Sequence, residues 1–232
     1  MNIAIFVTIW SAGISSADMN DKFLDAPLDF LKGESAVHAV EVYTPEPGDV
    51  PKMDDVPAPT IIVQIDMNDS DAAKALVESD KFRSVFLDKA NFPAPVEDIK
   101  LDVTEIVNFP LPGHETPPDR TAALTFVVRY YGPVKNASEF ADFYTKNHPP
   151  ILSQFPDIRN VRCYLPLDWK TTGEVSDNRL IIGNEVVFDD LDALNAALKS
   201  DVLPLAKEDS KHFQEYGYST HHAMHREKVF SR

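Results

Sequence analysis

Apolar and polar residues alternate along several short runs of the chain, and this period of two is typical of β-strands that bury one face. In the second half these runs are ALTFVVRYY, NVRCYLPL, RLIIGNEVVF and GYSTHHAMHREKVF. Two other segments, SEFADFYTKN and DLDALNAALKS, have the apolar spacing of helices. We expect Asn136 to cap the first helix, and Pro149 and Pro150 to end it. The predicted order of elements is βαββαβ.

The first half repeats this order. Its predicted strands are IAIFVTIW, AVHAVEVYT, PTIIVQIDM and DIKLDVTEIV, and its predicted helices are DMNDKFLDAPLDFL and DAAKALVESDKF. Pro27 interrupts the first of these helices, because proline lacks a backbone N–H and its ring clashes with the preceding turn. A shift of 121 positions aligns the halves without a gap, so that Tyr43 lies on Tyr164 and NDSDAAKALVESD lies on DDLDALNAALKSD. The chain therefore contains an internal repeat.

The repeat predicts two modules, over residues 1–110 and 122–232, joined by a proline-rich linker over 111–121. A βαββαβ unit folds into a four-stranded antiparallel sheet with both helices on one face, and its bare face needs a cover. Each module can cover the other. The expected fold class is therefore α+β: two ferredoxin-like modules fused in tandem, with antiparallel sheets packed face to face into an α+β barrel.

Strand alternation separates the residues that face the helices from those that face the other module. Ile5, Val7, Phe126 and Val128 belong to the apolar set expected beneath the helices. The opposite set mixes aromatic, polar and charged residues, namely Phe6, Thr8, Trp10, Glu41, Tyr43, Gln64, Val127, Arg129, Tyr131, Tyr164 and Glu185. Aromatic walls with a few polar groups are typical of a small-molecule site. The alternative is that these residues satisfy one another inside a closed barrel.

Charge narrows the classes of partner. The 232 residues include 37 acidic and 22 basic side chains, for a formal net charge of −15. A chain this acidic is repelled by nucleic acid and by anionic membrane surfaces, so we expect neither as a partner. The apolar N-terminal run MNIAIFVTIW is too short to span a bilayer and lacks the basic start of a secretory signal, so we expect a cytoplasmic protein. Cys163 is the single cysteine, and it lies in a strand pattern typical of a buried, inert thiol.

The run FVVRYYGPVKNASEFADFYTKNHPPILSQFPDIRNVRCYLPL resembles an EthD-like domain of the dimeric α+β barrel superfamily, in which a helix ending in His-Pro follows a strand. The resemblance covers the second half. In the first half Pro27 lies where His148 would be, so that half keeps only the architecture and is degenerate. The resemblance implies barrels made from two such modules. Many members act without a metal or organic cofactor, as isomerases, cyclases, decarboxylases or monooxygenases on small phenolic, polyketide or lactone compounds.

The same resemblance points to His148 as a catalytic acid or base at the cavity mouth, a role that suits an imidazole because its usual pKa lies near neutrality. The alternative is a helix-end histidine that interacts with the helix dipole. Tyr131 and Tyr164 could orient or protonate a substrate oxygen, and Arg129 could neutralise a developing enolate. Further candidate substrate-binding residues in the same cavity are Thr8, Trp10, Tyr43, Glu185 and His222.

The histidines near the C-terminus do not predict a metal site. His221 and His225 share a strand face while His222 faces the other way, and two ligands are too few for zinc. No cofactor is expected, although a haem with His148, His38 or His222 as axial ligand is an alternative. The segment with Trp169 and TTGEVSDN is expected to be a hairpin connection, to which no chemistry is assigned.

The leading functional hypothesis is a cofactor-independent lyase, isomerase, cyclase or monooxygenase that acts on a small aromatic, polyketide-like or lactone compound in the barrel cavity. The alternative is a non-catalytic α+β barrel that binds a small ligand or serves as a stress-response accessory protein. The fusion of two modules makes a monomer feasible, and a homodimer is compatible with the sequence.

Overall fold

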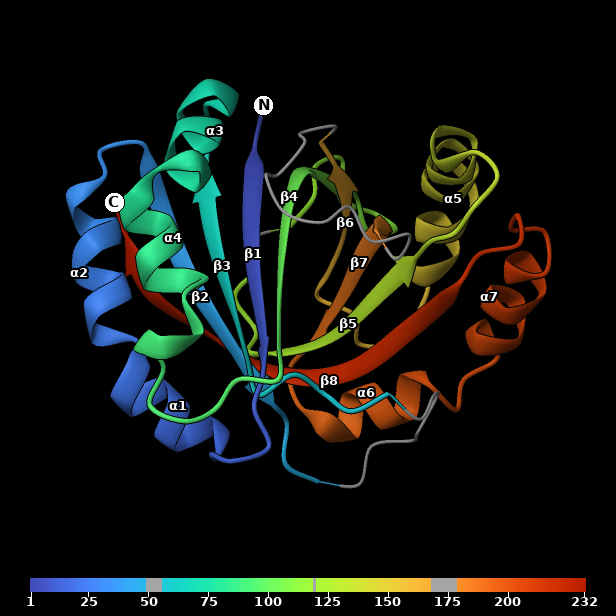
Figure 1. Ribbon diagram of the computed structural model, residues 1–232. Helices are drawn as coiled ribbons and strands as arrows, with labels where there is room; N and C mark the ends of the chain where they lie inside the picture. The colour runs from blue at the N-terminus through green and yellow to red at the C-terminus, as the bar shows by residue number, and fades with distance from the viewer. Residues whose placement is uncertain (49–55, 119, 168–178) are drawn as a thin grey trace.

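Eight antiparallel strands close into one barrel in the computed structural model of the chain, which describes residues 1–48, 56–118, 120–167 and 179–232 (Figure 1). The strands are β1 (Ile3–Trp10), β2 (Val37–Pro45), β3 (Ile61–Met67), β4 (Asp98–Phe109), β5 (Leu124–Tyr131), β6 (Asn160–Pro166), β7 (Leu180–Phe188) and β8 (Tyr218–Ser231). Their order around the barrel is β1-β3-β2-β8-β5-β7-β6-β4. The predicted α+β class and the predicted barrel are confirmed.

Each half of the chain contributes four neighbouring strands to the barrel. Those of the first half lie in the order β4-β1-β3-β2, and those of the second half in the order β8-β5-β7-β6, so corresponding strands take corresponding places. Two antiparallel junctions, β2 with β8 and β4 with β6, join the halves. The closed sheet has no open edge, because both edges of each half pair with the other half.

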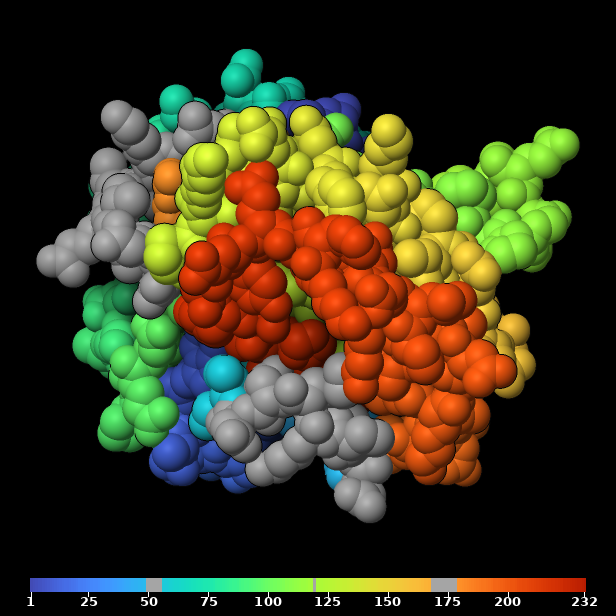
Figure 2. Space-filling model, turned by 90° about the vertical axis from the view of Figure 1, so that its right-hand side faces the viewer, coloured from blue at the N-terminus to red at the C-terminus, as the bar shows by residue number. Residues whose placement is uncertain are grey.

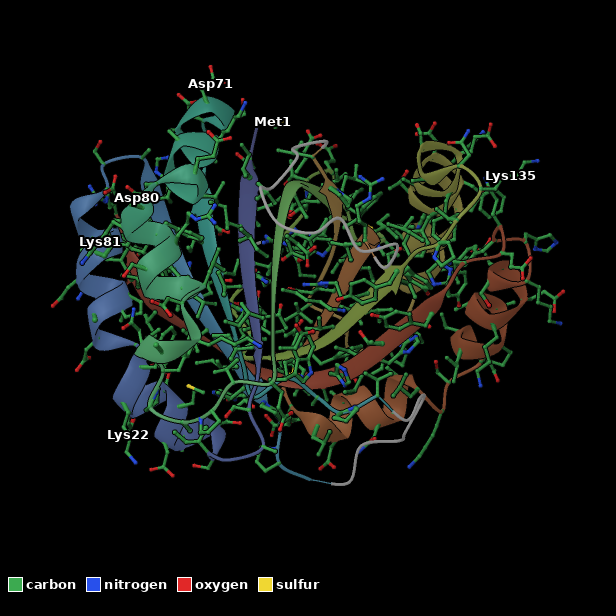
Figure 3. The ribbon with its side chains drawn as sticks, in the orientation of Figure 1. Met1, Lys22, Asp71, Asp80, Lys81 and Lys135 are labelled. Atoms are coloured by element: carbon green, nitrogen blue, oxygen red, sulfur yellow. The ribbon has the colours of Figure 1, made fainter. Side chains whose placement is uncertain are left out.

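The helices all lie outside the barrel, in two groups on opposite sides (Figure 1). On one side are α1 (Ser16–Phe23), α2 (Asp25–Gly33), α3 (Ser70–Glu78), α4 (Asp80–Phe86) and the short 3₁₀ helix η1 (Lys89–Asn91). On the other side are α5 (Ala137–Leu152), α6 (Leu191–Ala197) and α7 (Val202–Ser210). Figure 3 shows charged side chains such as Asp71, Lys81 and Lys135 pointing away from the barrel. No helix in the described ranges is long and apolar enough to cross a membrane.

Local sequence explains where most helices start. Asn136 caps α5 as predicted, since its side chain accepts a hydrogen bond from the backbone N–H of Glu139 at 3.2 Å. Asp69 and Asp190, which align at the 121-residue offset, cap α3 and α6 in the same way. The predicted interruption of the first helix is real, but the break falls at Leu24, and Pro27 lies in the first turn of α2, where proline is tolerated.

Two helix predictions for the second half are wrong. Pro149 and Pro150 do not end α5, which continues to Leu152. The buried side chains of Pro149 and Leu152 pack this last turn, and the bond from Ser153 N to Pro149 O (2.8 Å) closes it, which offsets the donors that the prolines lack. The sequence pattern also missed α7, in which Pro204 occupies the first turn. The hairpin connection expected around Trp169 lies outside the described residues.

Three apolar clusters follow from the strand alternation. The first lies between the first-half helices and their strands, and includes Ile5 and Val7. The second lies between α5–α7 and the second-half strands, and includes Phe126 and Val128. The third is small, lies inside the barrel, and contains Phe6. The predicted division of each strand into a helix-facing and an inward-facing set therefore holds.

Candidate active site

Side chains that point into the barrel form a dense polar network. Arg120, from the predicted linker, reaches into the barrel and pairs with Glu41 of β2 and with Glu185 of β7, the latter at 2.5 Å. Its guanidinium also donates to the hydroxyl of Tyr43 at 2.7 Å and to that of Tyr164 at 3.3 Å. These five side chains are at least nine-tenths buried. One cation thus joins carboxylates and phenols from both halves of the chain.

Further pairs extend this network. Arg226 of β8 donates to Glu41 at 3.0 Å, and Tyr43 donates to the side-chain oxygen of Gln64 at 2.5 Å. Burial alone would raise the pKa of Glu185, but Arg120 and the other interior guanidinium groups lower it below its usual value. The carboxylate of Glu185 is therefore held ionised by its partners, as a structural ion pair requires.

Arg129 and Tyr131, which we predicted as catalytic, lie within this interior. The guanidinium of Arg129 lies over the rings of Phe6 and Tyr164, at 4.7 and 5.1 Å from their centroids. Gly183 makes room for it, because a Cβ there would lie 3.0 Å from the Arg129 side chain. Tyr131 stacks on Tyr218 with 4.8 Å between the ring centroids, and burial raises its pKa.

The predicted substrate-binding residues also lie in the interior or at its end. Tyr43 and Glu185 belong to the network around Arg120. Thr8 is buried on β1, and Trp10 at the end of that strand donates its indole N–H to Pro57 O at 3.2 Å. His222 pairs across the sheet with the inward-facing Val127. Many inward residues therefore pair with one another through Arg120, although Nε of Arg120 and Nε of Arg226 have no hydrogen-bond partner among the described residues.

His148 does not share that interior. It lies on α5, outside the barrel, where its ring contacts those of Tyr144 and Phe213 at 4.8 and 5.3 Å between centroids. The prediction that His148, Tyr131 and Tyr164 line one space is wrong, because the sheet separates α5 from the barrel interior. His148 is also not a helix-end residue, since α5 continues past it to Leu152.

A cavity of about 120 Å³ lies beside His148, between the second-half helices and the outer face of the sheet. Its walls are mostly apolar and come from β5, β7, α5, α6 and α7, with Phe126, Val128, Phe155, Val186, Leu194 and Leu203 among them. The lining residues with polar side-chain atoms are Asn184, Lys207, Ser210, His148, His221, Tyr130 and Tyr144. Figure 2 shows this side of the molecule, where the surface is hollowed between the orange and red segments. Apolar walls with a few polar groups match the usual make-up of a ligand site.

His148 forms a dyad with Asp209 of α7. Its Nδ1 lies 2.8 Å from Oδ2 of Asp209, and the two side chains are only 8% and 11% exposed. Burial lowers the pKa of His148, while the hydrogen bond to Asp209 opposes part of that effect. An ionised carboxylate can only accept, so the neutral imidazole carries its proton on Nδ1 and keeps the lone pair of Nε2 for another proton. The dyad is arranged as a general base.

Asn184 adds an unused donor to the same cavity. It lies on β7, is 1% exposed, and its Nδ2 has no hydrogen-bond partner among the described residues. A buried polar group without a partner is costly, by about 1–3 kcal/mol, so such a group in a cavity indicates a place for a ligand acceptor. A carbonyl, phenolate or enolate oxygen would satisfy it.

The corresponding positions of the first half carry apolar residues. At the 121-residue offset, Pro27 replaces His148, Val63 replaces Asn184 and Phe23 replaces Tyr144. Phe23 stacks on Phe92 with 4.4 Å between the ring centroids and belongs to the fully apolar first cluster. The polar cavity lining is thus a property of the second half.

Sequence reasoning found His148 but missed Asp209, Asn184 and Lys207. Asp209 and Lys207 lie on α7, which the pattern did not predict. Asn184 had a signal, because it is a polar residue between Ile182 and Val186 on the face of a strand that is otherwise buried beneath helices. A polar residue at such a position needs a partner, and a ligand can be that partner.

The cavity does not fit a haem. Its volume of about 120 Å³ is close to that of a cavity of about 150 Å³ that accommodates benzene, whereas a porphyrin joins four pyrrole rings. His38, another proposed axial ligand, is exposed on β2 on the far side of the barrel, and His222 faces the interior. Across the described ranges, no three His, Cys, Asp or Glu side chains are grouped to hold a metal.

Comparisons with solved structures show that other proteins share this fold over nearly the whole chain. An anthrone oxidase-like protein superposes with a TM-score of 0.62 at 12% identity, over 98% of this chain and 93% of that one. A proposed monooxygenase from Fusobacterium nucleatum gives 0.56 at 11% identity, over 100% and 95%. Another from Lactobacillus acidophilus gives 0.52 at 10%, over 97% and 93%. At these identities the likeness concerns the fold alone.

Neither a protein-family model nor a curated protein matches the sequence. Fold and site together define a closed α+β barrel with a histidine–aspartate dyad beside a small apolar cavity.

Proposed function

We propose that the chain is a cofactor-independent enzyme that moves a proton on a small cyclic compound held in the cavity beside His148. The single observation that carries the proposal is the His148–Asp209 dyad, which lines an apolar cavity together with the unsatisfied amide of Asn184. The compound is an aromatic, polyketide-like or lactone molecule of about one ring, since the cavity measures about 120 Å³. The site lies outside the barrel instead of within it.

The chemistry follows from three groups. Nε2 of neutral His148 takes a proton from a carbon next to a carbonyl, while Asp209 holds the imidazolium that results. The amide N–H of Asn184 donates to the oxygen on which negative charge develops, as in an oxyanion hole. The apolar walls exclude water, which strengthens both interactions. The enolate that forms is the common first intermediate of isomerisation, cyclisation and lyase reactions of ketones.

The internal repeat supports this assignment. We infer that the chain is a tandem fusion of two ferredoxin-like modules, over 1–110 and 122–232, of which the second is EthD-like. The matching strand orders of the two halves support that inference. In the first module, Pro27 and Val63 replace the proposed base and donor, so the duplication has left one polar site. Arg129, Tyr131 and Tyr164 then act on stability rather than on substrate.

The experiment measures exchange of the α-protons of cyclohexanone into D₂O by NMR. This ketone has one ring, one oxygen for Asn184 and acidic C–H bonds for His148. The native protein should accelerate exchange above buffer, and His148→Ala should lower the rate by about 10²-fold or more. Asn184→Val, which copies Val63 of the first half, should also slow exchange while raising stability, because it removes a buried amide without a partner.

The matched control is His225→Ala. The side chain of His225 is 53% exposed on β8, outside the cavity lining, so its loss should leave the exchange rate unchanged. Binding of cyclohexanone without accelerated exchange would instead indicate a non-catalytic ligand-binding protein. Equal rates for the native protein and His148→Ala would show that the dyad is not the base.

A further inference from the structure

Lys207 brings a positive charge to the outer end of the cavity. It lies in the last turn of α7 and lines the cavity, yet it is exposed, whereas Asn184 at the sheet is buried. The cavity lining thus includes one exposed residue and one buried residue, on the helix and on the strand respectively. A ligand that reaches Asn184 with an oxygen would direct its other end toward Lys207.

The charges around the cavity are uneven. Among the lining residues that the structure describes, Lys207 is the one lysine or arginine, and there is no carboxylate. Asp209 lies behind His148 and is engaged by it at 2.8 Å. Glu208 and Lys211 on the same stretch pair with each other, and no ion pair of Lys207 occurs within the described ranges.

The positive charge of Lys207 is opposite in sign to the net charge of the chain. The chain carries a net charge of −15, so an anionic ligand is repelled by the molecule as a whole unless a local cation receives it. At the 121-residue offset the first half has Phe86, which is fully buried against Phe82 at 4.8 Å between ring centroids. The lysine therefore occurs only in the half that has the polar cavity.

We propose that the ligand of this site carries a carboxylate, which Lys207 binds at the cavity mouth while the ring lies against the apolar walls and its oxygen meets Asn184. This inference rests on the proposed function, because it assumes that the cavity beside His148 is the substrate site. It defines the substrate class as a one-ring phenol or cyclic ketone with a short acidic side chain.

The test compares two probes of nearly equal shape, 4-hydroxyphenylacetate and 4-hydroxyphenylacetamide, by isothermal titration calorimetry. The native protein should bind the carboxylate more tightly than the amide by about fivefold, the upper range for an exposed ion pair. Lys207→Met should remove that preference and leave the affinity for the amide unchanged. Added salt should weaken the preference of the native protein, because exposed charges are screened.

Lys211→Met is the matched control, because Lys211 is a similarly exposed lysine that follows α7 and does not line the cavity. It should keep the full preference for the carboxylate. Equal binding of the two probes by the native protein, with loss of both in Asn184→Val, would overturn the carboxylate inference and leave the proposed site standing. Failure of both probes to bind would overturn the inference and the proposed function together.

Discussion

His148 is buried beside a carboxylate, and this environment sets the pH at which it can act. Burial lowers its pKa below the usual value of about 6.5, and the hydrogen bond with Asp209 restores part of the difference. The proposed base must be neutral. Its environment therefore keeps it in the required state at neutral pH and over part of the acid range.

The rate of α-proton exchange should therefore rise with pH through the pKa of His148, with its midpoint below the usual histidine value of about 6.5, and then level off. Asp209→Asn removes the group that raises this pKa, so the rise should move to lower pH while the plateau falls, because the ring loses its orientation. Exchange rates measured across the acid range would show both effects. A rise centred above the usual histidine pKa would contradict the buried dyad.

The free energy of unfolding should also rise with pH in this range. The folded state favours neutral His148, so this preference contributes stability above the unfolded-state pKa of about 6.5 and is lost as pH falls toward the lower pKa of the folded state. His148→Gln should flatten that part of the stability profile in urea unfolding. A profile unchanged by the substitution would show that His148 does not titrate differently on folding.

At the scale of the elements, the linker supplies a residue to the interior of the barrel, which the sequence did not predict. The side chain of Arg120 extends from the linker into the barrel. It pairs there with Glu41 of β2 and Glu185 of β7, two strands from different halves of the chain. Removal of one partner from a buried ion network leaves the others without compensation, which is more costly than the loss of an exposed pair. We infer that Arg120 is a main electrostatic contact between the halves.

Arg120→Met should lower the free energy of unfolding by about 3–5 kcal/mol, because Glu41 and Glu185 stay buried and lose their shared partner. Urea unfolding followed by circular dichroism measures the change. Arg159→Met is the control, since Arg159 pairs with Asp189 on the surface and its loss should alter stability little. If both variants unfolded like the native protein, the interior network would not stabilise the barrel.

The strands and their faces could be predicted from the sequence, because alternation and the 121-residue repeat are strong local signals. The site was harder to predict. Asp209 was missed with α7, since Pro204 in the first turn conceals the helical pattern. The interior network depends on Arg120, and no local sequence pattern shows that the side chain of a linker residue will bond to Tyr43 inside the barrel.

At the scale of the whole molecule, the two halves share the barrel but differ in the space between their helices and strands. Both supply strands that close the barrel, and the first half buries a fully apolar layer beneath its helices. The second half instead has a cavity with a dyad and an unsatisfied amide. Such features lower stability, and functional sites commonly contain them. We propose that this helix–sheet cavity, and not the barrel interior, receives the ligand.

The most direct test is a crystal structure of the native protein soaked with 4-bromophenol, in which the anomalous signal of bromine locates the ring. The account predicts one bromine site between α5, α7 and the outer face of β5 and β7, with the phenol oxygen at Asn184 or His148. A bromine site inside the barrel, among Tyr43, Tyr164 and Arg120, would contradict it, and so would a cavity that stays empty.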